Sequence, residues 1–264
     1  MKILFFGDII GKIGRRAIKE ILPQLKAEFR PDLIIANGEN LAHGLGVTER
    51  ILNEMVAAGI NVFTSGNHIM DKPEAEVLLL AKDSVLLKPA NYPAVTSGQG
   101  FKIIDCAGKK IMVVSLVGRV FMKEEFECPF KKIDAILQEH AKRKLAGIIV
   151  DFHAEATSEK TAFGWYIDGR VSAVLGTHTH IPTADAKVLP NGTAYVSDVG
   201  MVGASNSVIG VEVEPIVSSF LNDTSARIEI PETGQVEVNA VLVEIDPKTG
   251  KAISIQRVDR KTNV

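Results

Sequence analysis

The segment KILFFGDIIGKIGRRAIKEILPQLKAEFRPDLIIANGEN, residues 2–40, decides the fold of this chain. Two short apolar runs within it, Ile3–Phe6 and Leu33–Ala36, have the composition of buried strands. Between them, Arg15–Phe29 repeats its apolar residues at helical spacing, and Pro23 predicts a kink or break in that helix. Because the order strand, helix, strand favours parallel pairing, the segment predicts an α/β fold.

The rest of the chain extends this pattern into a second β layer. Further strands are predicted at Val62–Thr64, Phe101–Ile104, Ile111–Leu116, Gly147–Val150, Ala173–Leu175, Lys187–Leu189 and Ala194–Val196, with a terminal hairpin from Val236–Ile245 and Ala252–Arg257. The predicted helices are Glu49–Ala58 capped by Thr48, Pro73–Ala81, Phe130–Leu145, Glu159–Ile167 capped by Ser158, and Glu214–Leu221. We therefore expect one domain, residues 1–264, with two β layers covered by helices.

Composition excludes several classes of protein. The 264 residues are 46% hydrophobic and 23% charged, as is usual for a soluble globular protein with a large core. The formal net charge of -2 gives no electrostatic argument for a nucleic-acid or membrane-surface partner. Cys106 and Cys128 form neither a disulfide framework nor a zinc motif. The apolar start of the chain is interrupted at Asp8, too early for a signal peptide or a membrane span, so we expect a cytoplasmic protein without a membrane partner.

Five apolar runs each end in a residue that can bind a metal ion. They are ILFFGD, LIIANGEN, VFTSGNH, IIVDFH and AVLGTHTH, which end at Asp8, Asn40, His68, His153 and His180. In open α/β sheets the carboxyl ends of the parallel strands form the crevice in which ligands bind. Polar residues far apart in the sequence are therefore predicted to gather in one cluster.

The histidines indicate a transition-metal site. His178 and His180 stand two residues apart in Gly-Thr-His-Thr-His, so in an extended segment both side chains point to one face. Such a pair on its own is usually a solvated loop, but His153 follows another strand-like run, and three neutral imidazoles at strand ends suit a transition metal. His43 and His140 are interpreted as ordinary surface or core residues.

Carboxylate and amide oxygens complete the candidate ligand set. Asp8 and Glu39 supply carboxylates, and Glu39 is the candidate to bridge two cations because it has two oxygens. Asn40 and Asn67 offer amide carbonyl oxygens directly after buried strands. This mixture suits Fe, Mn or Zn better than Ca or Mg. His68, next to Asn67, is placed to act as a general acid, with an outer positioning role or an extra ligand as the alternatives.

The motifs resemble those of a known enzyme superfamily. The blocks G-D-I-I-G, N-G-E-N, G-N-H, D-F-H-A-E and G-T-H-T-H occur in the order found in the calcineurin-like metallophosphoesterases. The resemblance covers about residues 1–210 and is greatest to the YmdB-like branch, described as 2′,3′-cyclic-nucleotide 2′-phosphodiesterases. Ile10 in place of a histidine, and N-G-E-N in place of G-D-x-x-D, depart from the wider superfamily and fit that branch. The fold implied is a metallophosphoesterase-like βαβ sandwich of two mixed sheets flanked by helices.

The resemblance also implies the roles of the site residues. The first metal ion would be held by Asp8, Glu39, Asn40 and His180, the second by Glu39, Asn67, His153 and His178, and the proton donor would be His68. The implied cofactors are two divalent or trivalent transition-metal ions, iron first and manganese or zinc as alternatives. A hydroxide bridging them would attack a 2′,3′-cyclic nucleotide in line and leave a 3′-nucleotide, which makes the chain a metal-dependent phosphoric diester hydrolase.

Two further functions are compatible with the same residues. One is a broad phosphomonoesterase or phosphatase with the same metals, and the other is a regulatory nucleotide-sensing protein with little turnover. A dinucleotide-binding enzyme is excluded because Gly7–Gly14 only loosely resembles the glycine fingerprint and Asp8 would face the pyrophosphate. The expected partner is a small phosphodiester, RNA-derived cyclic nucleotide ends fit the same chemistry, and homo-oligomerisation is left open.

Overall fold

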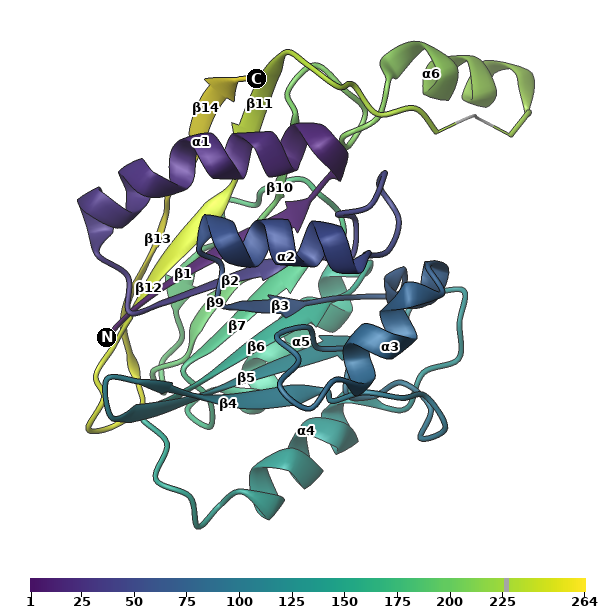
Figure 1. Cartoon of the computed structure of the whole chain (residues 1–264). Coiled ribbons are helices and arrows are strands. Elements are labelled where there is room, and N and C mark those ends of the chain that lie inside the picture. The colour runs from purple at the N-terminus through teal and green to yellow at the C-terminus, as the bar shows by residue number, and fades with distance from the viewer. Residues whose placement is uncertain (226–227) are drawn as a thin grey trace.

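The computed structural model, which describes residues 1–225 and 228–264, consists of two mixed β-sheets with helices outside them (Figure 1). This confirms the predicted fold class. The 8-stranded sheet contains β1 (Lys2–Ile9), β2 (Leu33–Asn37), β3 (Val62–Thr64), β10 (Met201–Ala204), β11 (Gln235–Val238), β12 (Ala240–Ile245), β13 (Ala252–Arg257) and β14 (Arg260–Asn263). The 6-stranded sheet contains β4 (Phe101–Cys106), β5 (Lys109–Val117), β6 (Gly147–His153), β7 (Ala173–Thr177), β8 (Lys187–Val188) and β9 (Ala194–Val196).

Parallel pairing dominates the centre of both sheets. In the first sheet β1 pairs in parallel with β2, and β2 in parallel with β3, while β12 runs antiparallel to β1. In the second sheet β5, β6, β7 and β9 are parallel to their neighbours, and β4 and β8 are antiparallel edge strands. Since parallel strands end at the same edge, each sheet presents a row of carboxyl ends that can carry a site.

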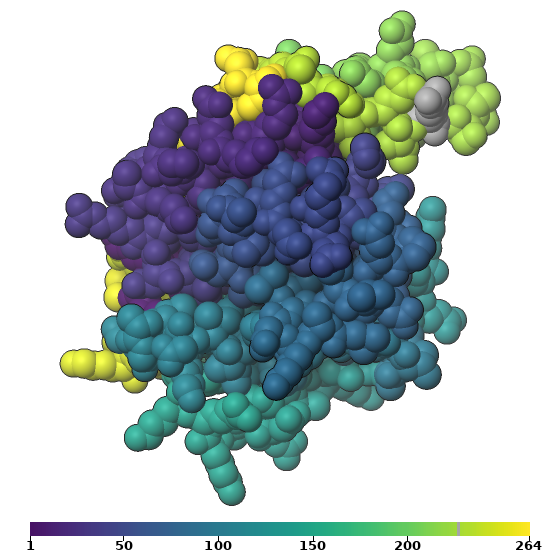
Figure 2. All heavy atoms as spheres, in the orientation of Figure 1, coloured from purple at the N-terminus to yellow at the C-terminus, as the bar shows by residue number. Residues whose placement is uncertain are grey.

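Successive side chains on a strand point to opposite faces of the sheet, so each sheet packs against the other sheet on one face and against helices on the other. On β1, Phe5 faces the second sheet and Phe6 faces the helices, and both side chains are buried. Helices α1 (Gly11–Phe29) and α2 (Glu49–Ala58) cover the first sheet, and α4 (Pro129–Glu139) and α5 (Thr157–Ile167) cover the second (Figure 1). The remaining helices are α3 (Glu74–Leu80) and α6 (Val213–Asn222). Helix α6 has no buried residue and projects from the body of the molecule (Figure 2). None of the helices in the described part of the chain is both long and apolar enough to cross a membrane.

The structure corrects three helix predictions. Of the kink or break predicted at Pro23, the break is wrong, because α1 continues through this residue. Pro23 and Lys19 are both exposed, so water can satisfy the Lys19 carbonyl that loses its helical partner. The helix predicted for Phe130–Leu145 ends at Glu139, and the exposed basic residues that follow it have no apolar surface to pack on. Ser158 is not the cap of α5, since the helix begins one residue earlier.

Strand boundaries also differ at the carboxyl end of the chain. The single strand predicted for Val236–Ile245 is divided at Asn239 into β11 and β12. The Oδ1 atom of Asn239 accepts a hydrogen bond of 3.1 Å from the backbone N–H of Met201, which ties this junction to β10. Strands β10 and β14 were not predicted from the sequence.

Candidate metal centre

The eight predicted site residues come together at the carboxyl ends of five parallel strands. They are Asp8 in β1, Glu39 and Asn40 after β2, Asn67 and His68 after β3, His153 at the end of β6, and His178 and His180 after β7. The side chains of His153 and Glu39 can both approach the backbone at residue 66 because that residue is glycine. A Cβ atom there would lie 2.1 Å from Cδ2 of His153 and 2.4 Å from Oε2 of Glu39, so only glycine fits between them.

Four potential ligand atoms lie close together, three of them next to Nε2 of His153. The Nε2 atom of His153 lies 3.1 Å from Oε1 of Glu39, 3.2 Å from Oδ1 of Asn67 and 3.0 Å from Nδ1 of His178. Ligand atoms of Glu39, His153 and His178 all lie within 4.8 Å of one another. Two imidazole nitrogens, a carboxylate and an amide oxygen form a donor set that suits a transition metal. These are the four residues expected to hold the second ion.

The residues expected to hold the first ion include two unpaired oxygens. The Oδ1 atoms of Asp8 and Asn40 are buried and have no hydrogen-bond partner among the residues that the structure describes. Oδ1 of Asp8 lies 4.0 Å from Nε2 of His180, and the side-chain N–H of Asn40 donates to the carbonyl of Gly44 at 2.7 Å. Burying polar oxygens without a partner is costly, and a cation would satisfy both atoms. The residues present therefore fit a metal ion at this place as well.

Two histidines are oriented by oxygens outside the cluster. The Nε2 atom of His178 lies 3.0 Å from a carboxylate oxygen of Glu155, and Nδ1 of His180 lies 2.8 Å from the carbonyl oxygen of Ile209. These oxygens can only accept, so the proton of each neutral ring is placed on the nitrogen that faces them. The other ring nitrogen keeps its lone pair for a metal ion, as in most metal-binding histidines. Sequence reasoning missed the parts played by Glu155 and the Ile209 carbonyl.

A buried polar network orients His153 in the same way. Its Nδ1 atom lies 2.9 Å from the hydroxyl of Thr177, which in turn donates to Oδ1 of Asp151 at 2.7 Å. Asn37 and Thr64 donate to Oδ2 of Asp151. Burial raises the pKa of Asp151 to about 7, although His153 and these hydrogen bonds oppose the shift. Asp151 stands in the D-F-H-A-E block, which was the available sequence signal for this network.

The electrostatics of the cluster favour a positive charge at its centre. Burial opposes protonation of His153, but the Glu39 carboxylate outweighs burial and raises the pKa of His153 to about 9. Burial and the neighbouring His153 lower the pKa of His178 to about 3. Burial would raise the pKa of Glu39, yet His153 lowers it to about 2, which keeps the carboxylate ionised. The ionised carboxylate of Glu39 is the group whose negative charge a metal ion would balance.

The loop that carries His178 and His180 has a strained backbone that a buried ion pair holds in place. Both residues have positive backbone φ values, 100° and 65°, which residues other than glycine rarely adopt. Between them, the backbone N–H and the hydroxyl of Thr179 donate to Oδ2 of Asp198 at 3.1 and 2.7 Å. The same oxygen pairs with Nζ of Lys160 at 2.8 Å, and both side chains are buried. The position of the two imidazoles therefore depends on Asp198 and Lys160.

His68 lies at the rim of the cluster. Its backbone N–H donates to Oε2 of Glu39 at 3.2 Å, and its Nδ1 atom lies 2.7 Å from Oδ2 of Asp71. The side chain is 35% exposed, so a substrate can reach it. The hydroxyl of Tyr92 donates to the carbonyls of Gly66 and Asn67 at 3.0 and 3.1 Å, and these bonds hold the loop that carries His68. With Nδ1 occupied by Asp71, Nε2 of His68 is the atom available for proton transfer.

The chain resembles known proteins over nearly its whole length. Residues 4–258 match the family described as YmdB-like protein. A 2′,3′-cyclic-nucleotide 2′-phosphodiesterase of Bacillus subtilis (strain 168) is 44% identical over 260 residues, which are 98% of this chain and 96% of that protein. A phosphatase structure from Mycoplasma pneumoniae has a TM-score of 0.92 and 36% identity, over 100% of this chain and 94% of the other. A hypothetical protein from Thermus thermophilus has a TM-score of 0.91 and 38% identity, over 99% of both chains.

Proposed function

Because the chain belongs to the YmdB-like family of metallophosphoesterases, we propose that it hydrolyses 2′,3′-cyclic nucleotides to 3′-nucleotides at a two-metal site. That the chain is a phosphoric ester hydrolase follows from its phosphodiesterase and phosphatase relatives. The observation that carries the proposal is the group of ligand atoms from Glu39, Asn67 and His178 that lies 3.0 to 3.2 Å from Nε2 of His153. Imidazole nitrogens, a carboxylate oxygen and an amide oxygen that converge in this way form a ligand set that suits a transition metal.

Two overlapping ligand groups share Glu39. One group consists of Asp8, Glu39, Asn40 and His180, and the other of Glu39, Asn67, His153 and His178. We assign iron to both, with manganese or zinc as alternatives, because the histidine nitrogens and carboxylate oxygens suit these metals. When bound, two cations supply Lewis-acid charge that polarises the phosphoryl oxygens and makes a water molecule acidic enough to attack at neutral pH.

The protein's own contribution is to fix the donors and to supply a proton. Thr177, Glu155 and the Ile209 carbonyl hold the three imidazoles in the orientation that metal binding requires. As the bond between phosphorus and O2′ breaks and the bond to the water oxygen forms, His68 transfers the proton at Nε2 to O2′. The products are then a free 2′-hydroxyl and a 3′-phosphate monoester. Asp71 keeps the His68 ring in place through Nδ1.

A substrate panel tests the proposal against the phosphatase and sensor alternatives. We expect the metal-loaded enzyme to convert 2′,3′-cyclic AMP to 3′-AMP and to hydrolyse bis(p-nitrophenyl) phosphate, with a much lower kcat/KM for p-nitrophenyl phosphate. The reason is charge, because both diesters carry one negative charge, whereas p-nitrophenyl phosphate is a dianion at neutral pH and is repelled more strongly by the buried carboxylates of Asp8 and Glu39. A preference for the monoester would favour a phosphatase, and tight binding of the cyclic nucleotide without turnover would favour a sensor.

A further inference from the structure

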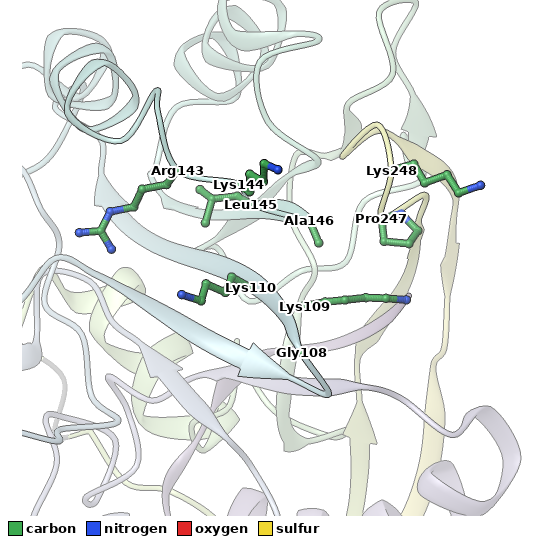
Figure 3. A pocket seen from close by; sticks show the side chains of 9 residues that line it. All are labelled: Gly108, Lys109, Lys110, Arg143, Lys144, Leu145, Ala146, Pro247 and Lys248. Carbon is green, nitrogen blue, oxygen red and sulfur yellow. The ribbon is translucent and has the colours of Figure 1, made fainter.

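A basic hollow lies where β5 and β6 begin, at the end of the second sheet opposite the metal centre, and Figure 3 shows the residues that line it. We use this name for a depression of about 840 Å³ lined by Gly108, Lys109, Lys110, Arg143, Lys144, Leu145, Ala146, Pro247 and Lys248. Five of these residues are cationic and none is acidic. All five cationic side chains are exposed. Although the whole chain has a formal net charge of -2, this part of its surface is strongly positive.

The positive charges of the hollow exceed the negative charges beside them. No ion pair or side-chain hydrogen bond joins any of them to another residue within 1–225 or 228–264. Two acidic residues offset part of this charge, because Asp105 lies directly across the β4–β5 ladder from Lys110, and the pKa of Asp246 is lowered by the backbone N–H of Lys248 and by its charge. The excess of positive charge that remains attracts anions to this part of the surface.

The arrangement of the cations suits an extended anion. Figure 3 shows the side chains of Lys110 and Arg143 pointing to one side of the hollow and those of Lys109 and Lys248 pointing to the other. A compact anion could not contact both groups, whereas a chain of phosphates could. No aromatic residue lines the hollow, so recognition would depend on phosphate charge and not on base stacking.

The position of the hollow separates it from the chemistry. Lys109 and Lys110 begin β5, and Arg143 to Ala146 precede β6, which ends seven residues later at His153. At about 3.3 Å per residue, the hollow lies about 20 Å from His153 along the strand. A ligand in the hollow therefore cannot be the phosphate that reacts, although a longer strand could occupy both places.

We propose that the basic hollow binds the phosphate backbone of single-stranded RNA and that RNA with a 2′,3′-cyclic phosphate end is a substrate of the enzyme. The substrate part rests on the proposed function, because hydrolysis of RNA yields ends of this chemistry. An anionic membrane is disfavoured as the ligand, since Leu145 and Pro247 are half-buried, Ala146 is buried, and no apolar side chain of the hollow is free to insert.

Salt-dependent RNA binding tests the site without turnover. The probe is a labelled single-stranded RNA of about ten nucleotides with a 3′-hydroxyl end, which lacks the cyclic phosphate of the proposed substrate, and its binding is measured by fluorescence anisotropy. Five phosphate contacts at about 0.7 each give a slope of log K against log salt of about -3.5, or about a hundredfold loss of affinity between roughly 50 and 200 mM salt. In the double variant Lys109→Gln/Lys110→Gln the slope should fall to about -2.1, or about a twentyfold loss.

A charge-matched control makes the result specific to the hollow. Lys26 and Lys82 are exposed and lie outside it, so Lys26→Gln/Lys82→Gln should leave the slope at the wild-type value. Equal slopes in the two double variants, or RNA binding that does not respond to salt, would overturn the proposal. Binding to phosphatidylserine vesicles that is lost in Lys109→Gln/Lys110→Gln while RNA binding stays unchanged would overturn it in favour of a membrane site.

Kinetics separate this inference from the proposed function. The KM for RNA with a 2′,3′-cyclic phosphate end should be lower than that for 2′,3′-cyclic AMP, and Lys109→Gln/Lys110→Gln should reduce the difference without changing turnover of the mononucleotide. If the variant kept the same difference in KM, the proposal for the hollow would be contradicted and the proposed function would not. If the wild-type enzyme failed to turn over either substrate, the proposed function would fail while the anisotropy result would still decide whether the hollow binds RNA.

Discussion

Glu39→Gln should reduce kcat/KM for 2′,3′-cyclic AMP at least about a thousandfold, which corresponds to about 4 kcal/mol of transition-state stabilisation. Glu39 is buried, with Oε1 facing His153 and Oε2 accepting the backbone N–H of His68. A glutamine must direct its NH₂ group either at the His68 N–H, where two donors would meet, or into the ligand cluster, where a donor cannot bind a cation. The variant should therefore lose bound metal together with activity, as measured by elemental analysis and steady-state kinetics.

Two other glutamate variants calibrate this effect. Glu155→Gln alters only the oxygen that orients His178 and should cost about 10–100-fold, the usual effect of removing an outer partner of a metal ligand. Glu20→Gln, on the exposed surface of α1, should leave activity and metal content unchanged. If Glu39→Gln retained wild-type turnover with full metal content, Glu39 could not be the shared ligand.

His68→Gln should lower kcat for 2′,3′-cyclic AMP by about 10²–10⁴-fold, the range expected for loss of a general acid. The ribose O2′ is a poor leaving group and needs a proton, whereas p-nitrophenolate leaves without one. The same variant should therefore lose less than about tenfold towards bis(p-nitrophenyl) phosphate. The contrast between the two substrates is the measurement, because it reports the leaving group and not the fold.

Metal content distinguishes an acid from a ligand at this position. His68 lies at the rim, outside the group formed by Glu39, His153 and His178, so His68→Gln should keep its metal. His43→Gln, at an exposed histidine close in sequence to Asn40, is the matched control and should not change either rate. Equal losses on both substrates together with a fall in metal content would show that His68 is a ligand and not a proton donor.

Most of the fold could be predicted from local patterns because the deciding residues are buried apolar runs. Ile3–Phe6, Leu33–Ala36 and Gly147–Val150 are strands in the structure, and the helices between them were found from apolar spacing. Strand β10 could not be found this way, since Met201–Ala204 is short and contains glycine. The division at Asn239 depends on a hydrogen bond to Met201, a contact between segments far apart in the sequence.

The candidate metal ligands could also be predicted from local patterns. The groups that orient these ligands could not. The polar residues that end β1, β2 and β3 must gather at one edge of the first sheet, and those that end β6 and β7 at one edge of the second. The orientation of His153, in contrast, depends on Thr177, which stands beside it only because β6 and β7 pair in this register. The same holds for the Ile209 carbonyl that faces His180, since the loop that carries it has no motif of its own.

Reconstitution of the metal-free enzyme tests the account most directly. The protein is stripped with a chelator, ferrous or manganous ions are returned in measured amounts without oxygen, and turnover of 2′,3′-cyclic AMP is followed with identification of the product. We expect no turnover without metal, a rate that rises until two ions are bound per chain, and 3′-AMP as the product. Full turnover by the metal-free chain, or a rate that is already maximal at one ion per chain, would contradict the two-metal phosphodiesterase.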